Sequence, residues 1–383
     1  MKLSKRSQDF TQSEIRSMTK ECNKVDGINM AQGVCDLEVP PIVMQSAKEA
    51  MDNGINIYTP SEGLPELRIA IADKMKRFYD LEIDGMSEVM VSDGATGAFY
   101  TAVLSLLNPE DEVILFEPYY GYHKATLNTA GVRTKYVRME APHWEIDFSA
   151  LEEAVSDKTR GILICNPGNP SGKVFTLSEL EALGAFATKH DLVVFSDEMY
   201  EHFLYDEVQH IPALSVSSLK ERTVQISGFS KVFSVTGWRI GYAIASKEII
   251  AAMANYNDLI YVCAPAPLQI GVSEGLKQLD DSYYIDLAKV HQEKRDLFCT
   301  ALEEVGLNPS VPKGAYYVMC DVSSVEGSDD KAKALHILKT TGVASVAGRA
   351  FYHDASGSNM VRFCYSKPID VLKEAAQQIR KLG

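Results

Sequence analysis

The chain has 383 residues, of which 46% are hydrophobic and 23% are charged, and its formal net charge is -14. This length is typical of two domains that share a connecting element, and it leaves room for a large enzyme. The acidic balance, without a long block of lysine and arginine, argues against a nucleic-acid surface. No apolar run approaches the roughly 20 residues that span a bilayer, and the start of the chain lacks the apolar core of a signal peptide. We therefore expect a cytoplasmic protein that does not bind membranes.

The seven cysteines are scattered along the chain and show no Cys-x-x-Cys spacing. An odd number of dispersed cysteines is typical of reduced thiols, most of them in the core. We expect neither a disulfide framework nor a metal site.

From about residue 89 to residue 245, short apolar runs alternate with amphipathic stretches. Apolar runs without polar alternation are typical of strands that are buried on both faces. The predicted strands are 89–91, 113–116, 162–165, 192–195, 224–226 and 242–245. Helices are predicted between them, over 99–107 and after Thr176, where Thr-Leu-Ser-Glu forms a capping box. The pattern predicts an α/β domain with a largely parallel sheet.

Beyond Pro267 the spacing of the apolar residues changes to that of a long helix, which ends at Gly306. Its predicted apolar stripe consists of Ile285, Leu287, Val290, Leu297, Phe298, Leu302 and Val305. Strands over 315–321 and 359–365, with helices over 330–341 and 368–382, predict a small α+β domain. We place the large domain at 45–275 and the small domain at 1–44 together with 276–383. The cleft between them is the expected binding site.

The segment from Ser227 to Gly241 places Lys231 just after a predicted strand and Arg239 eight residues later. A buried lysine can attack an aldehyde covalently, and an arginine fork matches the geometry of a phosphate. The pair suits an aldehyde cofactor that also carries a phosphate, and pyridoxal 5'-phosphate is the candidate. An isolated Ser-Lys pair is more often a solvated charge at a strand edge, so the prediction depends on companion motifs.

Three further turns follow strands of the same predicted sheet. Residues 92–97 open a helix, whose unpaired N–H groups and small side chains suit a phosphate. Residues 166–172 contain two Asn-Pro steps, and an asparagine held there can donate to a phenolate oxygen. Asp197 can keep a pyridine nitrogen protonated, and Tyr200 can reach the ring oxygen. A plain turn or a helix cap explains each motif alone, but hardly all of them in this order.

The set of motifs resembles the class I and II aminotransferases, which are pyridoxal-phosphate enzymes of the aspartate aminotransferase fold type, fold type I. The resemblance extends from Gln32 to Arg362 and is most specific over 166–172 and 230–241. It implies a mostly parallel, seven-stranded sheet in the large domain and pyridoxal 5'-phosphate as the cofactor. It also implies a homodimer with shared active sites, amino-acid and 2-oxo-acid substrates, and a place in amino-acid metabolism.

The resemblance further implies roles for single residues at the cofactor ring. Lys231 would anchor the cofactor covalently and move the substrate proton as a general base. Asn169 and Tyr200 would bind the ring oxygen, Asp197 would face the ring nitrogen, and Tyr120 would stack on the ring.

Phosphate and substrate contacts follow from the same resemblance. The implied phosphate contacts are Ala95, Thr96, Arg239 and, reaching into the neighbouring subunit, Tyr58. The implied substrate contacts are Gly33, Asn169 and Arg362, and Arg362 would grip the α-carboxylate with a bidentate fork. Where some members carry a phosphate-binding serine, this chain has Gly228, so the roles of the flanking Ser227 and Ser230 stay open.

Three functions compete on these observations. The leading prediction is transfer of the amino group of an L-amino acid to a 2-oxo acid by ping-pong half-reactions. The runs 94–99 and 116–120 look closer to kynurenine, glutamine and methionine aminotransferases than to dedicated aspartate enzymes. A carbon–sulfur β-lyase is the alternative enzyme on this scaffold. A cofactor-sensing domain of a transcription regulator is a third reading, which we do not expect, because no basic helix pair precedes Gly33.

Overall fold

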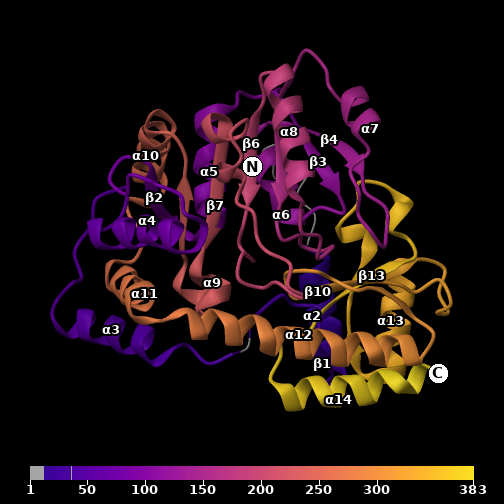
Figure 1. The fold of residues 1–383 in the computed structure, drawn as a ribbon. Helices are drawn as coiled ribbons and strands as arrows, with labels where there is room; N and C mark the ends of the chain where they lie inside the picture. The colour runs from indigo at the N-terminus through magenta and orange to yellow at the C-terminus, as the bar shows by residue number, and fades with distance from the viewer. Residues whose placement is uncertain (1–12, 36) are drawn as a thin grey trace, which may run out of the picture.

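The computed structural model describes residues 13–35 and 37–383, and its central feature is a seven-stranded sheet with the order β2-β8-β7-β6-β5-β3-β4 (Figure 1). The strands are β2 (Val89–Asp93), β3 (Glu112–Glu117), β4 (Arg133–Arg138), β5 (Thr159–Cys165), β6 (Val193–Asp197), β7 (Thr223–Gly228) and β8 (Ile240–Ile244). All neighbours pair in parallel except β8, which is antiparallel to both β2 and β7. The predicted strands and the largely parallel sheet are confirmed.

Strand β4 is the one strand of this sheet that the sequence did not reveal. It lies at the sheet edge beside β3, and only one of its six residues, Val137, is buried. A polar edge strand carries no continuous apolar run, and for that reason the pattern of buried strands does not reach it.

Helices cover both faces of the sheet, and the side chains of β3 divide between two cores. Val113 and Leu115 join the core formed with α5 (Gly94–Leu106), α6 (Gly121–Ala130) and α10 (Lys247–Tyr261). Ile114 and Phe116 join the core formed with α4 (Pro65–Tyr79), α8 (Leu177–Lys189) and α11 (Ala266–Gln278). Helix α8 begins with the predicted capping box, formed by Thr176. The result is a three-layer α/β arrangement.

A second, antiparallel sheet lies at the other end of the molecule, with the order β12-β13-β10-β9 (Figure 1). Its strands are β9 (Asn308–Ser310), β10 (Tyr317–Asp321), β12 (Val346–Ala347) and β13 (Met360–Cys364). The helices near it are α12 (Asp281–Glu304), α13 (Asp330–Thr341) and α14 (Ile369–Ile379). The predicted strands and helices of the C-terminal third are thus confirmed, while the exact domain boundaries stay a prediction.

Short elements complete the fold. They are α2 (Glu14–Lys24), α3 (Pro41–Asp52), α7 (Phe148–Glu153), α9 (Phe229–Val232), β1 (Ile28–Asn29) and β11 (Val343–Ala344). Strand β1 pairs in parallel with β11, which ties the beginning of the described chain to its C-terminal third.

The predicted apolar stripe of α12 was partly wrong. Ile285 and Val290 are 64% and 41% exposed, whereas Leu287, Phe298 and Leu302 are buried. The buried face instead includes amphipathic side chains such as His291, which an apolar pattern does not count.

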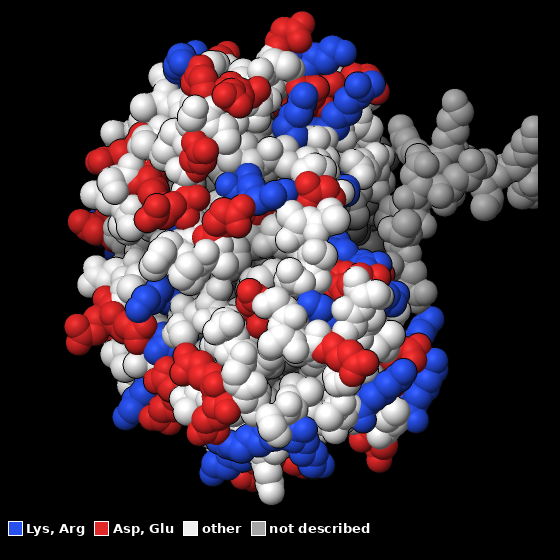
Figure 2. Space-filling model, turned by 90° about the vertical axis from the view of Figure 1, so that its right-hand side faces the viewer, with Lys and Arg blue, Asp and Glu red and all other residues white. Residues whose placement is uncertain are grey.

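The distribution of charge on the surface agrees with the acidic composition of the chain. On the face shown in Figure 2, basic side chains lie in small groups among acidic ones. All seven cysteines are free thiols, and five of them are buried, as expected. Among the residues that the structure describes, none of the helices combines the length and the apolar character that a membrane crossing requires.

Candidate active site

The sequence motifs meet at one edge of the seven-stranded sheet. Asn169 and Asp197 follow or end the parallel strands β5 and β6, and Lys231 follows β7. The carboxyl ends of parallel strands lie at the same edge, where α/β sheets bind ligands. Because β8 runs the other way, its beginning after Arg239 reaches this edge too, as the pairing of Gly241 with Gly228 requires.

Lys231 has a backbone carbonyl as its hydrogen-bond partner. Its Nζ donates to the carbonyl oxygen of Gly33 at 2.8 Å, and none of the ion pairs between described residues involves it. Although part of its side-chain surface is exposed, protein atoms surround the amine, and this burial lowers the pKa of Lys231 despite the opposing effect of Cys364 and Cys35. A lysine without an acidic partner and with a lowered pKa offers a larger fraction of neutral, nucleophilic amine.

Asp197 is held by a histidine that the sequence reasoning missed. His123 Nε2 lies 2.8 Å from Asp197 Oδ2, and the Met199 N–H donates to Oδ1 at 3.2 Å. The ring of Tyr120 meets His123 edge to face, with 5.2 Å between the ring centroids. The three-residue spacing of Tyr120 and His123 at the start of a helix was the available signal. These contacts fix the direction of the carboxylate.

Arg362 and Asn169 come from different sheets and touch. Arg362 Nη1 donates to Asn169 Oδ1 at 2.9 Å, and Nη2 donates to the Ala31 carbonyl at 2.8 Å. The guanidinium lies 4.3 Å from the ring centroid of Tyr317 and 4.9 Å from that of Phe351. Its buried Nε has no hydrogen-bond partner among the described residues. An oriented guanidinium with a donor to spare suits an incoming carboxylate.

Tyr317 connects three predicted site residues, although the sequence motifs did not include it. Its hydroxyl lies 3.0 Å from that of Tyr200, and its ring faces Arg362. A Cβ atom on Gly33 would lie 2.1 Å from the Tyr317 hydroxyl oxygen, so any larger residue at position 33 would displace this ring. Burial raises the pKa of Tyr200 well above its ordinary value, with a further contribution from Tyr317.

The predicted phosphate turn is a close contact between two segments. Gly94 has a φ of +69°, and a Cβ atom there would lie 2.3 Å from Arg239 Nη2. The Gly94 N–H donates to the Arg239 carbonyl at 2.9 Å, and Arg239 Nη1 donates to the Thr236 carbonyl at 3.1 Å. Ala95 and Thr96 lie in the first turn of α5. A helix N-terminus beside a guanidinium is a favourable place for an anion.

Tyr58 does not join these residues within one chain. Its side chain is 81% exposed, and the neighbouring Ile57 is 80% exposed. A site contact by Tyr58 therefore requires a second subunit.

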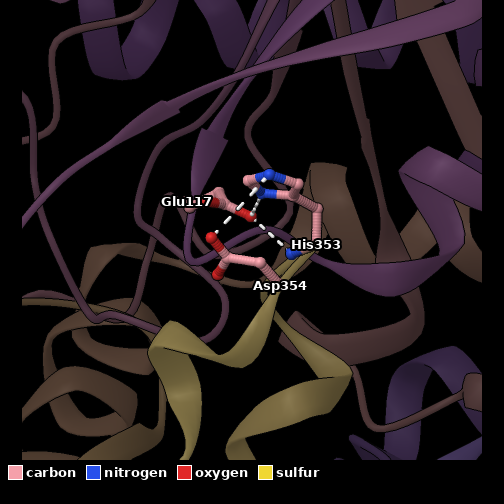
Figure 3. A group of neighbouring side chains, drawn as sticks. All are labelled: Glu117, His353 and Asp354. Carbon is pink, nitrogen blue, oxygen red and sulfur yellow. Dashed lines mark hydrogen bonds and ion pairs between the residues drawn. The ribbon is translucent and has the colours of Figure 1, made fainter.

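A further cluster lies between β3 and the segment before β13. Figure 3 shows the buried Glu117 beside His353 and Asp354, three side chains whose donor atoms could together hold a metal ion. The Glu117 carboxylate accepts from the His353 N–H at 2.6 Å and lies 2.9 Å from its Nδ1. Arg138 Nη2 donates to Asp354 at 3.0 Å. A guanidinium already supplies positive charge here, so the cluster serves as an ion-pair contact between the two segments.

Comparisons with known proteins identify the family to which the chain belongs. The profile of the family "Aminotransferase class I and II" matches residues 25–379. The chain is 33% identical over 373 residues to an aspartate aminotransferase from Pyrococcus abyssi. The aligned region covers 97% of this chain and 95% of that protein. It is 30% identical to a methionine aminotransferase from Escherichia coli, covering 93% and 92%. The solved N-succinyldiaminopimelate aminotransferase of Mycobacterium tuberculosis superposes with a TM-score of 0.95 at 31% identity over 100% of both chains.

The chain therefore belongs to the class I and II aminotransferases and has the fold of the fold type I enzymes. It is an enzyme that transfers amino groups. The names of these relatives favour amino-group transfer over the β-lyase alternative.

Proposed function

We propose that this aminotransferase uses pyridoxal 5'-phosphate, attached covalently to Lys231, to move the amino group of an L-amino acid to a 2-oxo acid in ping-pong half-reactions. The observation that carries the proposal is the amine of Lys231, which has no acidic partner among the described residues and lies at the edge where the other motif residues gather. The family supports the choice of cofactor.

The residues present fit this cofactor. Because Gly94 has no Cβ atom, the Arg239 guanidinium can lie against the N-terminus of α5, so a phosphate would find donors from both elements. The Asp197 carboxylate, directed by His123, would face the ring nitrogen, and Tyr120 would lie against the ring. Asn169 and Tyr200 would donate to the ring oxygen.

Bound pyridoxal phosphate supplies an electron sink for the bond broken at the substrate α-carbon and stores the amino group between half-reactions. With the cofactor bound, Lys231 Nζ would take the α-proton of the substrate and return it as a general base and acid. Arg362 would bind the α-carboxylate through its unpartnered Nε and a neighbouring nitrogen, with Asn169 fixing the orientation of the guanidinium. Gly33 would let the substrate approach the backbone.

We also propose that the enzyme is a homodimer with shared active sites. Ile57, Tyr58 and Leu259 are large apolar or aromatic side chains that are 80%, 81% and 79% exposed. Burying them against a second copy would bring Tyr58 to the phosphate of the neighbouring subunit. Light scattering should give the mass of two chains, and a monomer with full activity would contradict the proposal.

Seven free thiols support a reducing compartment, and we propose that the enzyme works in the cytoplasm. Fractionation of cells that produce the full-length protein should recover its activity with cytoplasmic markers. Recovery of the activity in a secreted fraction would contradict this proposal.

A spectrophotometric half-reaction screen tests reaction type and donor preference together. The enzyme loaded with pyridoxal phosphate is mixed with each of twenty amino acids, and the visible absorption of the lysine-bound cofactor is followed. We expect loss of this absorption with at least one amino acid and its recovery on addition of a 2-oxo acid. Release of pyruvate from L-cystathionine faster than any 2-oxo acid is aminated would favour the β-lyase instead.

A further inference from the structure

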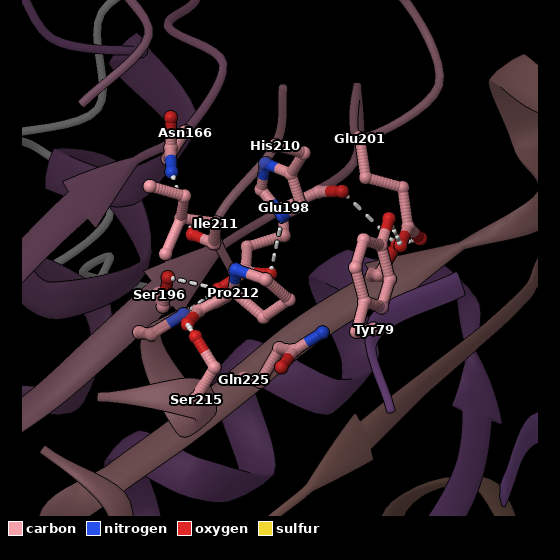
Figure 4. A network of polar contacts seen from close by, with 12 residues as sticks. Tyr79, Asn166, Ser196, Glu198, Glu201, His210, Ile211, Pro212, Ser215 and Gln225 are labelled. Atoms are coloured by element: carbon pink, nitrogen blue, oxygen red, sulfur yellow. Dashed lines mark hydrogen bonds and ion pairs between the residues drawn. The ribbon is translucent and has the colours of Figure 1, made fainter. Parts of the chain in front are cut away.

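The segment that carries Asp197 and Tyr200 also carries two buried glutamates. Glu198 has no exposed surface and Glu201 is 6% exposed. The hydrogen-bond partners of the two carboxylates are not the residues proposed to bind the cofactor or the substrate. Figure 4 shows both side chains within a network of polar contacts that also includes Tyr79 and His210. Charged groups are costly to bury, so their partners indicate what they do.

Glu201 is surrounded by donors from three other elements. Lys74 Nζ, from helix α4, lies 2.5 Å from its Oε1, and the Tyr79 hydroxyl donates to Oε2 at 2.8 Å. Ser227 Oγ from β7 donates to Oε1 at 3.1 Å, and the Tyr242 hydroxyl from β8 does so at 3.3 Å. Lys74 also donates to Tyr242 at 2.6 Å. We call these five residues the Lys74 network.

The electrostatics of the network depend on the ion pair. Burial alone would raise the pKa of Glu201, but Lys74, together with the nearby His202 and His210, holds it at about 2. Burial alone would lower the pKa of Lys74, but Glu201 and Tyr242 raise it above its ordinary value. Burial lowers the pKa of His202 to about 3, so that ring is neutral near pH 7. Lys74 is thus the strongest influence that favours the charge on Glu201, and Glu201 is the strongest that favours the charge on Lys74.

Glu198 fixes the other side of the same segment. Its Oε1 accepts from Ser196 Oγ at 2.7 Å and from the Ala213 N–H at 3.0 Å, and its Oε2 lies 2.8 Å from His210 Nε2. Its backbone carbonyl lies 3.2 Å from Ser227 Oγ, so the single hydroxyl proton of Ser227 is shared between Glu198 and Glu201. The Ser227 hydroxyl thus lies within hydrogen-bond distance of both Glu198 and Glu201.

The network joins three segments that end in proposed site residues. Glu201 follows Tyr200 directly, and Ser227 precedes Lys231 by four residues. Tyr242 lies on β8, which begins directly after Arg239. An apolar filling of this space would lack directional bonds, whereas hydrogen bonds to a charged carboxylate fix the distances between the segments.

We propose that the Lys74–Glu201 ion pair is a positioning device of this aminotransferase, which fixes the segment 197–200 relative to strands β7 and β8. Lys74 and Glu201 act through the residues of that segment and touch no reacting atom. The inference rests on the proposed roles of Asp197 and Tyr200 at the cofactor ring.

The test compares Lys74→Met, Glu201→Gln and the double variant, each loaded with pyridoxal phosphate. Three quantities are measured: the pH midpoint at which the visible absorption of the bound cofactor titrates, the kcat and KM for an active amino acid, and the thermal midpoint. Each single variant should move the spectral midpoint by about 0.5 pH unit or more and lower kcat about tenfold. The KM should change less than about twofold, because Arg362 and Asn169 lie on other segments.

The double variant should recover much of the thermal midpoint, because no unpaired charge stays buried. Its spectral midpoint and kcat should stay displaced, because the bond between Lys74 and Glu201 is lost; wild-type values for both would contradict the inference. Should Lys74→Met fail to fold, Ser227→Ala and Tyr242→Phe each remove one hydroxyl of the network and should move the spectral midpoint in the same assay.

The matched control is Lys333→Met. Lys333 is another buried lysine, 7% exposed, whose Nζ donates to Asn359 Oδ1 at 2.8 Å, outside the network. It should lower the thermal midpoint and leave the spectral midpoint in place. Network variants that lower only the thermal midpoint, as the control does, would overturn the inference. A wild-type enzyme that gave no visible absorption with pyridoxal phosphate would contradict the proposed function instead.

Discussion

Two lysines of the protein interior lie in opposite electrostatic settings. Lys74 has a carboxylate, Glu201, at 2.5 Å, and although burial lowers its pKa, this partner more than reverses the effect. Lys231 has only the carbonyl of Gly33, and burial lowers its pKa. The first lysine is kept as a fixed charge and the second as an available amine. An acidic partner thus distinguishes Lys74 from Lys231.

The largest expected effect follows from removing the available amine. Lys231→Ala should lower turnover about 10⁴-fold or more, because both covalent attachment and the general base are lost. Its free energy of unfolding should stay within about 1 kcal/mol of wild type, because only one hydrogen bond disappears. Steady-state kinetics and urea unfolding measure the two quantities. Retained turnover in this variant would refute the assignment of Lys231.

Removing the charge of Lys74 should mainly lower the free energy of unfolding, whereas removing the amine of Lys231 mainly lowers turnover. Lys74→Ala should cost about 3–5 kcal/mol in the free energy of unfolding, because it leaves the buried Glu201 carboxylate without its counter-charge. Urea unfolding of the cofactor-free protein provides the measurement. A stability equal to wild type would show that the pair does not hold a buried charge, and the contrast between the two lysines would fail.

The pH dependence of stability tests whether Glu201 is held as a charged partner of Lys74. Since the pKa of Glu201 in the folded protein is about 2, below its ordinary 4.5, its contribution is present above pH 4.5 and is lost as the pH falls toward 2. This contribution is about 3 kcal/mol. Glu201→Gln should therefore lose less stability than wild type between pH 4.5 and 2 in urea titrations at several pH values. Parallel curves for the two proteins would contradict the depressed pKa.

Arg362 tests whether the site next to Lys231 was built for a carboxylate. Arg362→Lys keeps the charge but loses the fork, and should raise the KM for amino-acid donors about 10- to 100-fold. The kcat should fall less than kcat/KM. An unchanged KM for every donor would remove Arg362 from the substrate site.

The smallest expected effect concerns the histidine beside Asp197. His123→Phe removes the hydrogen bond at 2.8 Å and should lower kcat about tenfold, because the carboxylate loses its orientation. His123→Asn, which can restore one donor, should recover part of this loss. Equal kcat values for wild type and His123→Phe would mean that Met199 and the backbone hold Asp197 sufficiently.

The sequence predicted those parts of the fold and site that depend on local pattern. Buried strands are visible as apolar runs, and the motifs around Asn169, Asp197 and Lys231 follow them directly. The structure brings these motifs to one edge, and it adds the contact of Arg362 with Asn169 across 193 residues of chain.

The features that could not be predicted depend on contacts between distant segments. The polar edge strand β4 has no apolar run, and Tyr317 gains its role only because Gly33 and Tyr200 lie beside it. Lys74 resembles any charged residue of an amphipathic helix until Glu201 appears at its side chain. Pairing of charges across the fold carries no local signal in one sequence.

Peptide mapping of the borohydride-reduced enzyme tests the central contrast most directly. The protein is loaded with pyridoxal phosphate and reduced, so that the cofactor is fixed to the lysine that holds it, and the labelled peptide is identified by mass spectrometry. We predict one labelled lysine per chain, Lys231, with Lys74 unlabelled. Label on Lys74 or on another lysine, with Lys231 unmodified, would contradict the account.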